Sequence, residues 1–309
     1  MSAQFSRQSK QESLRFLKGV LFISMLLSSV SCGGARNETE NQNSINMPRS
    51  LKTSPNFTSR AAATKFEQNL SAGFPLPEID DAVTSRILKD YGAVFVARGA
   101  VVTAPKIIFE SEEDCAAWQA NDPKRQENFG GINIELQEAA MRELLAARAE
   151  ANARNFNFTA RGTLAARRNY GDTVKIWLTR VGPGLIYWTQ RGRLSEGEAA
   201  RIRTLEPSLQ VKEILQLESQ KMFFSKDFSK SILYSATAPG ASQHLSMLAV
   251  DLNEYANPAV REVLARHGWF QTIVSDLPHF TFLGVAESEL PALGLKKTVK
   301  DNRAYWTPE

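Results

Sequence analysis

Two histidines and two aspartates in the last quarter of the chain have the types and spacing of a metal site with a proton-transfer group. His244 precedes Asp251 by seven residues, and Asp276 precedes His279 by three. Two imidazoles and one carboxylate are a typical ligand set for Zn²⁺, and they leave a fourth position for water. A second carboxylate can accept and return a proton there. We therefore predict His244, Asp251 and His279 as metal ligands and Asp276 as the general base.

The chain must turn between His244 and Asp251 for both side chains to reach one metal. Side chains alternate along a strand, so a seven-residue step along an unbroken strand places the two residues on opposite faces. We expect a loop that carries His244, followed by a strand over residues 248–252 that carries Asp251. Pro278 cannot continue a helix, so His279 is expected at the rigid start of another strand.

These motifs resemble those of the family of zinc D-alanyl-D-alanine carboxypeptidases and dipeptidases. The resemblance lies in Ser-x-His ending at His244, in Ala-x-Asp ending at Asp251, and in the acidic residue three positions before His279. It covers roughly residues 134–282 and is strongest over residues 231–282. It implies a hedgehog-like zinc peptidase fold, zinc bound by the three predicted ligands, and the same general base.

The resemblance also implies two substrate-binding residues. The family has an upstream arginine that holds the terminal carboxylate of the substrate, and Arg168 lies where that residue belongs, just after a predicted helix. A guanidinium group suits a carboxylate because it offers two parallel donors. Arg161 and Arg167 remain alternatives. Ser242 is expected to form hydrogen bonds near the site.

Two departures from the family pattern leave a second function open. The family has Gly where Met247 stands and Glu where Asp276 stands. The main hypothesis is an exported zinc carboxypeptidase that hydrolyses the D-Ala-D-Ala terminus, or a similar peptide end, of the peptidoglycan stem peptide. The alternative is a non-catalytic, zinc-containing lipoprotein that binds peptidoglycan. An endopeptidase that acts on cross-links is a third, weaker hypothesis.

The elements that must position these residues mix helices and strands without regular alternation. Apolar residues at steps of three and four predict a helix over residues 136–154. Residues 174–178 fit either a strand or a helix that continues from Tyr170. Further helices are expected over residues 196–205, 211–220 and 258–267, and strands over residues 93–96, 106–109, 231–234, 248–252 and 280–283. The mixture predicts an α+β fold with a small antiparallel sheet and flanking helices.

His267 and Cys115 are interpreted as structural residues. His267 fits the last turn of its predicted helix, where an imidazole interacts favourably with the helix dipole. Cys115 stands in an acidic helix start with no adjacent His or Lys to lower its pKa, which predicts a half-buried, unreactive thiol.

The first 32 residues have the layout of a secretory signal peptide. Four basic residues precede an apolar run over residues 20–27, and small residues stand just before Cys32. The run is shorter than the about 20 residues of a transmembrane helix. Cleavage before a lipidated Cys32, with residues 1–31 as signal peptide, is the favoured interpretation, and ordinary cleavage after Ser31 is the alternative. Both predict export. The first predicts a periplasmic lipoprotein that a lipid on Cys32 anchors to the membrane.

Length and composition bound the rest of the interpretation. The chain has 309 residues, 43% of them hydrophobic, which is ample for a packed core. Its two cysteines exclude a disulfide scaffold. The net charge of +4 comes without a concentrated basic stripe, so no nucleic-acid partner is expected. Polar residues 32–60 are predicted to form a disordered tether, residues 61–130 an extension packed on the catalytic unit, and residues 131–309 the zinc peptidase domain.

Overall fold

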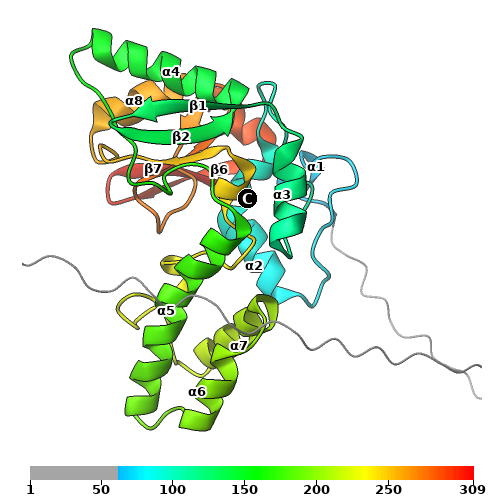
Figure 1. The fold of residues 1–309 in the computed structure, drawn as a ribbon. Helices are drawn as coiled ribbons and strands as arrows, with labels where there is room; N and C mark the ends of the chain where they lie inside the picture. The colour runs from blue at the N-terminus through cyan, green and yellow to red at the C-terminus, as the bar shows by residue number, and fades with distance from the viewer. Residues whose placement is uncertain (1–61) are drawn as a thin grey trace, which may run out of the picture. The chain divides into compact units, whose positions relative to one another are not determined.

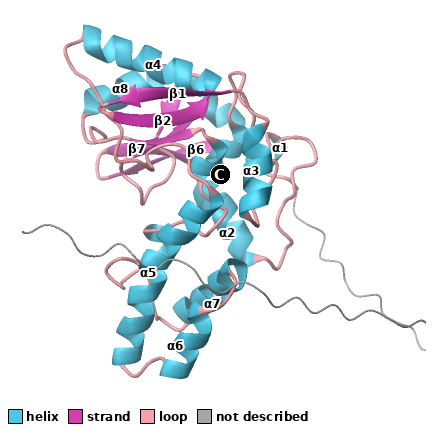
Figure 2. Cartoon of the chain, viewed as in Figure 1, coloured by secondary structure: helices cyan, strands magenta, loops and turns pink. Residues whose placement is uncertain are grey.

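Helices and small antiparallel sheets make up residues 62–309, the part of the chain that the computed structural model describes (Figures 1 and 2). The α-helices are α1 (Lys65–Gln68), α2 (Ala82–Tyr91), α3 (Glu112–Ala120), α4 (Glu138–Ala153), α5 (Tyr170–Gln190), α6 (Glu196–Arg203), α7 (Pro207–Ser219) and α8 (Pro258–Arg266). The strands are β1 (Lys124–Phe129), β2 (Ile132–Gln137), β3 (Ala249–Asp251), β4 (Trp269–Phe270), β5 (His279–Phe282), β6 (Leu295–Lys300) and β7 (Arg303–Pro308). Short 3₁₀ helices are η1 (Gly92–Val96), η2 (Ile232–Tyr234), η3 (Gln243–Ser246) and η4 (Glu287–Leu293). The predicted mixture of flanking helices with small antiparallel β structure is confirmed.

The sheet that carries the site has the strand order β3-β5-β4, and all its pairs are antiparallel. Every residue of β3, β4 and β5 is buried, as expected for a sheet covered on both faces. The register pairs Asp251 with His279. Residues directly opposite each other in an antiparallel pair have Cβ atoms about 5 Å apart. The register alone therefore brings two of the predicted ligands together.

Helices α4 and α8 pack against each other, α4 also against β1 and β2, and α8 against β4 (Figure 1). The predicted helical face of α4 is confirmed, since Ala140, Leu144, Ala147 and Ala151 are all fully buried. The helix starts at Glu138 rather than at residue 136, because the preceding residues pair in β2. The predicted helix over residues 258–267 is α8, whose start is capped by the preceding asparagine.

Helices α5, α6 and α7 pack together on the other side of the site (Figure 1). Residues 174–178 belong to α5, so of the two open interpretations the helix is correct. The side chain of Asn169 caps α5 by accepting from the backbone N–H of Asp172. The indole of Trp177 donates to Gln210 at 2.8 Å, which links α5 to α7. Because α5 begins directly after residue 169, its first turn fixes the position of Arg168.

Three predicted strands are wrong. Residues 93–96 lie in the 3₁₀ helix η1, residues 232–234 form the 3₁₀ helix η2, and residues 106–109 have no regular structure. A short apolar run is equally compatible with a buried strand and a buried turn of helix, because four residues show no period. Phe109 does donate to the backbone oxygen of Gly240, at 2.9 Å.

Two hairpins were not predicted from the sequence. Strands β1 and β2 carry mostly polar side chains, and their turn is Gly130-Gly131, where both residues have positive φ as a type I′ turn requires. The predicted domain boundary between residues 130 and 131 falls on this turn, so strands on both sides of it pair with each other. Strands β6 and β7 form the second hairpin, which turns at Asp301 and Asn302, again with positive φ.

The predicted signal peptide over residues 1–31, the tether over residues 32–60 and the lipidation site Cys32 lie outside the described residues. Within residues 62–309, none of the helices combines the length and the apolar character that a membrane crossing requires.

Candidate metal centre

The structure brings the three predicted metal ligands together in one buried cluster. His244 Nε2 lies 3.1 Å from His279 Nδ1 and 3.3 Å from Asp251 Oδ1, and His279 Nδ1 lies 3.2 Å from Asp251 Oδ1. In a tetrahedral zinc site with bonds of about 2.0–2.1 Å, neighbouring ligand atoms are about 3.3 Å apart. The three atoms therefore form one face of such a tetrahedron, and the cluster is able to hold a metal ion.

The expected turn between His244 and Asp251 is made by η3 and Met247. His244 lies in η3. Met247 is the first residue after η3 and has a φ of 54°, in the left-handed region. Its N–H donates to the backbone oxygen of His244 at 3.2 Å. This reversal leads directly into β3, whose last residue is Asp251, so that both side chains reach the same point.

The approach to η3 depends on Gly240, which has a φ of 79°. A Cβ atom at this position would lie 1.9 Å from the backbone oxygen of Phe109, so only glycine fits. Its N–H donates to the hydroxyl of Thr173 in α5 at 3.1 Å. These contacts hold the start of the ligand segment against α5.

The hydrogen bonds around the two histidines leave the nitrogens that face the cluster unprotonated. His244 Nδ1 lies 2.8 Å from the backbone oxygen of Ala166, which can only accept, so Nδ1 carries the proton. His279 Nε2 lies 2.8 Å from Oε1 of Gln243. The lone pairs of His244 Nε2 and His279 Nδ1 then face each other and the Asp251 carboxylate. Three such acceptors around one point are mutually repulsive without a cation, which favours a metal.

Gln243 orients His279 through a hydrogen bond, a role that was not predicted from the sequence. Its Nε2 donates to the backbone oxygen of Tyr91 at 2.7 Å, which fixes the amide so that Oε1 faces His279. The hydroxyl of Thr281 also donates to Oε1. Gln243 is 2% exposed. Its position between Ser242 and His244 was the only signal in the sequence, and nothing local indicates that its amide reaches a residue 36 positions away.

The charges of the cluster suit a metal site. Burial lowers the pKa of His244 to about 4, and the nearby Arg168 guanidinium acts in the same direction, so the imidazole is neutral at pH 7. Burial by itself raises the pKa of Asp251, but the pKa lies well below its usual range, and the Arg168 guanidinium 2.7 Å from Oδ2 holds the carboxylate in its ionised form. Neutral imidazole and ionised carboxylate are the forms that bind metals.

Arg168 reaches the cluster through Asp251. Its Nη2 donates to Asp251 Oδ2 at 2.7 Å and its Nε donates to the backbone oxygen of Leu164 at 2.9 Å. Nη1 makes no hydrogen bond to any described residue. Of the two alternative arginines, Arg167 pairs with Glu135 at 2.6 Å, and the guanidinium of Arg161 lies over the ring of Tyr255. Arg168 alone of these three contacts a cluster residue with its side chain.

No known protein family, curated protein or solved structure matches this chain.

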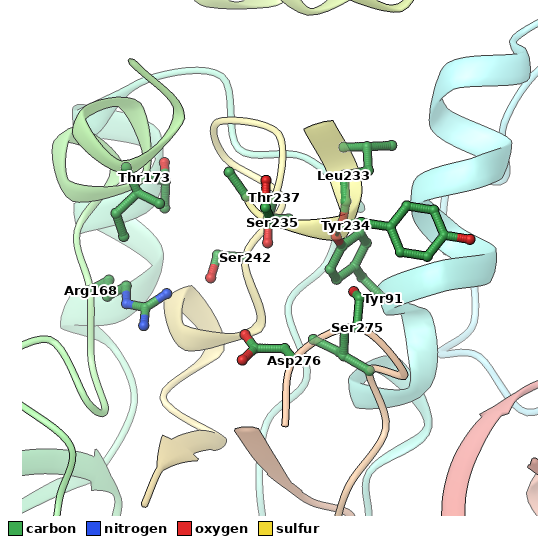
Figure 3. A pocket seen from close by; sticks show the side chains of 13 residues that line it. Tyr91, Arg168, Thr173, Leu233, Tyr234, Ser235, Thr237, Ser242, Ser275 and Asp276 are labelled. Atoms are coloured by element: carbon green, nitrogen blue, oxygen red, sulfur yellow. Dashed lines mark hydrogen bonds between the residues drawn. The ribbon is translucent and has the colours of Figure 1, made fainter. Parts of the chain in front are cut away.

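A hollow of about 330 Å³ lies beside the cluster and is lined by Arg168, Ser242 and Asp276 among others (Figure 3). Figure 3 shows the Asp276 carboxylate pointing toward Arg168 and Ser242. The carboxylate makes no hydrogen bond to any described residue, while the backbone oxygen of Asp276 accepts from the N–H of His279 at 3.3 Å. Burial raises the pKa of the Asp276 carboxyl. The three residues predicted to act on substrate thus share one recess.

The remaining histidine and the buried cysteine lie outside this site. His267 forms ion-pair contacts with Glu150 at 3.1 Å and Glu143 at 3.5 Å and follows the last residue of α8. Cys115 is fully buried in α3 rather than half buried as predicted, and burial raises the pKa of its thiol to about 11. A thiol of that pKa is not a nucleophile at neutral pH, which agrees with the structural role predicted for it.

Proposed function

We propose that this protein is an exported zinc-dependent carboxypeptidase that hydrolyses the D-Ala-D-Ala terminus, or a similar peptide end, of cell-wall peptides. The observation that carries the proposal is the triangle of two imidazole nitrogens and one carboxylate oxygen, with sides of 3.1 to 3.3 Å. The hollow beside it adds the Arg168 guanidinium and the Asp276 carboxylate, and this carboxylate forms no hydrogen bond with the described residues. A cation and a carboxylate are the groups that binding and hydrolysing a peptide end require. The resemblance of the motifs to zinc D,D-carboxypeptidases supports the same activity.

Each site residue has a proposed role. Zinc held by His244, Asp251 and His279 would supply Lewis acidity and lower the pKa of a water molecule. Asp276 takes a proton from the attacking water and returns it to the leaving amine as the peptide bond breaks. Burial raises the pKa of its carboxyl, which favours its taking up the proton.

Arg168 is proposed to hold the terminal carboxylate of the substrate. Its Nε–H donates to the backbone and one N–H of Nη2 donates to Asp251, which leaves both N–H groups of Nη1 and the second N–H of Nη2 for the substrate. The carboxylate is therefore expected at the Nη1 end of the guanidinium. Ser242 lines the same hollow and is placed to form a hydrogen bond with the bound peptide.

The proposed location follows from the start of the chain. A signal peptide over residues 1–31, cleaved before Cys32, would deliver the protein to the periplasm, and a lipid on Cys32 would anchor it to the membrane. The peptidoglycan stem peptide is a substrate available in that compartment.

The proposal is tested by giving purified, zinc-loaded protein a pentapeptide that ends in D-Ala-D-Ala and measuring free D-Ala. We expect release by the wild type, loss of release in His279→Ala, and a fall of at least about 100-fold in Asp276→Ala. His267→Ala is the matched control, because it removes an imidazole that forms only ion-pair contacts outside the site. A wild-type protein that holds zinc normally but releases no D-Ala from any of the peptides would contradict the proposal.

One observation favours a non-catalytic zinc lipoprotein that binds peptidoglycan as the second candidate. The predicted general base is Asp276, which is one methylene shorter than the Glu of the family that the motifs resemble. A protein that binds the pentapeptide without turnover, and that gains no activity in Asp276→Glu, would identify this function instead.

A further inference from the structure

A second hollow, of about 270 Å³, adjoins the one beside the metal cluster. The two hollows share part of their walls, namely Tyr91, Leu233, Tyr234, Ile273 and Ser275. Tyr234 is half exposed at this shared wall. A ligand that occupies the first hollow can therefore extend over the shared wall into the second.

The second hollow is rimmed by lysines. Lys89, Lys296 and Lys300 line it, and none of them forms an ion pair with any described residue. Asp90 is the single carboxylate among the lining residues, and Arg86 pairs with it at 3.4 Å. The rim therefore carries uncompensated positive charge, which raises the local concentration of anionic groups.

Strand β6 (Leu295–Lys300) places two of these lysines at the wall of the hollow. Lys296 and Lys300 are four residues apart in β6 and so lie on one face of the strand. Thr307, which pairs with Lys296 across the hairpin, lines the same hollow. Lys297 lies on the opposite face of β6, where it pairs with Glu287 at 2.9 Å. The strand thus offers two unpaired lysines on the hollow side and a paired lysine on the other.

The arrangement of the first hollow gives the direction in which a peptide would run. Figure 3 shows Arg168 on one side, Tyr234 and Ser275 on the other, and Asp276 between them. A peptide whose terminal carboxylate is held by Arg168 has its scissile bond near Asp276. Its residues on the amino side of that bond then extend toward Tyr234 and the lysines beyond it.

We infer that the hollow lined by Lys89, Lys296 and Lys300 binds a carboxylate of the substrate on the amino side of the scissile bond, and that the protein selects acidic peptides. This inference rests on the proposed function only for the placement of the scissile bond. The lysines are flexible and solvated, so they add modest affinity and act mainly as a selectivity filter.

The test compares peptides ending in D-Ala-D-Ala that carry one Glu, or Gln in its place, at each of the three positions before the D-Ala-D-Ala end. Binding is measured by calorimetry and hydrolysis by release of D-Ala. At one position at least, we expect the Glu peptide to bind about fivefold more tightly than its Gln partner. The ratio should fall to about one in Lys296→Gln/Lys300→Gln and in about 1 M salt, where charges are screened beyond about 3 Å.

Lys297→Gln is the matched control, because it removes a lysine from the same strand but from the opposite face, and it should keep the preference. Equal binding of the Glu and Gln peptides at every position, with D-Ala released from both, would overturn the inference and leave the proposed function standing. Preferred binding of a Glu peptide without any hydrolysis would support the inference and count against the carboxypeptidase.

Discussion

Nε2 of His279 lies 2.8 Å from Oε1 of Gln243, and this contact determines which nitrogen of His279 is left for a metal. Nε2 of Gln243 donates to the backbone oxygen of Tyr91. The amide oxygen and nitrogen of Gln243 therefore cannot exchange places without the loss of this hydrogen bond. His279 therefore keeps its proton on Nε2 and presents Nδ1 to the cluster. Partners of this kind that orient a ligand typically change metal affinity 10- to 100-fold when removed.

The first prediction concerns Gln243. Gln243→Leu removes the acceptor for His279 Nε2–H, so zinc affinity should fall by about 10- to 100-fold. Competition with a chromophoric chelator measures the affinity. Gln243→Glu keeps an acceptor toward His279 and should retain more of the affinity than the Leu variant. Wild-type affinity in Gln243→Leu would show that the contact does not orient the ligand.

The second prediction concerns removal of the metal. A ligand at about 100 times its dissociation constant stabilises the folded state by about 2.7 kcal/mol. For a domain of this size that corresponds to a rise of about 5 to 10 °C in melting temperature. Thermal unfolding with zinc and with a chelator should show this difference in the wild type and in His267→Ala, and should show none in His244→Ala. An equal melting temperature of the wild type with zinc and with the chelator would argue against the metal site.

The third prediction concerns the left-handed turn at Met247. Met247 is fully buried, so both Met247→Gly and Met247→Ala lose packing and should be less stable than the wild type by about 2 kcal/mol or more. Between the two, Gly should be more stable than Ala by about 0.5 to 1 kcal/mol, because only Gly adopts a φ of 54° without strain. Urea unfolding measures both values. The usual order, with Ala more stable than Gly, would refute the strained turn.

The fourth prediction concerns Glu218, which is buried in α7 and accepts from the backbone N–H groups of Ile232 at 2.6 Å and Phe224 at 3.3 Å. Burial raises the pKa of its carboxyl, and the hydrogen bonds do not outweigh this. The unfolded chain releases this proton at a pKa of about 4.3, and the folded state releases it only at a higher pH. Between these two pH values, the group therefore lowers the stability of the folded state as pH rises.

Glu218→Gln keeps an acceptor oxygen for both N–H groups and removes the titration. Relative to the wild type, the variant should therefore gain free energy of unfolding as pH rises above about 4.3, as measured by urea unfolding at each pH. A stability difference that is constant over this range, or that favours the wild type as pH rises, would contradict a raised pKa at Glu218.

Local sequence patterns were enough to find the three residues of the cluster that could hold a metal ion, and several elements. The spacing of His244 and Asp251 required a turn followed by a strand, and both are present. The apolar period predicted α4, and the Asn-Pro pair with the following Gly predicted α8, because helix periodicity and capping are properties of neighbouring residues. Short apolar runs failed for the opposite reason, since η1 and η2 contain too few residues to show a period.

Only the tertiary structure decided how the site is supported and bounded. The contact of Gln243 with His279, the contact of Arg168 with Asp251, and the lysine-rimmed hollow each join segments far apart in the chain. Residue types and spacing along the chain indicate which side chains can do chemistry. Which side chains meet depends on strand register and helix packing, and these follow from burial of the whole core rather than from any local pattern.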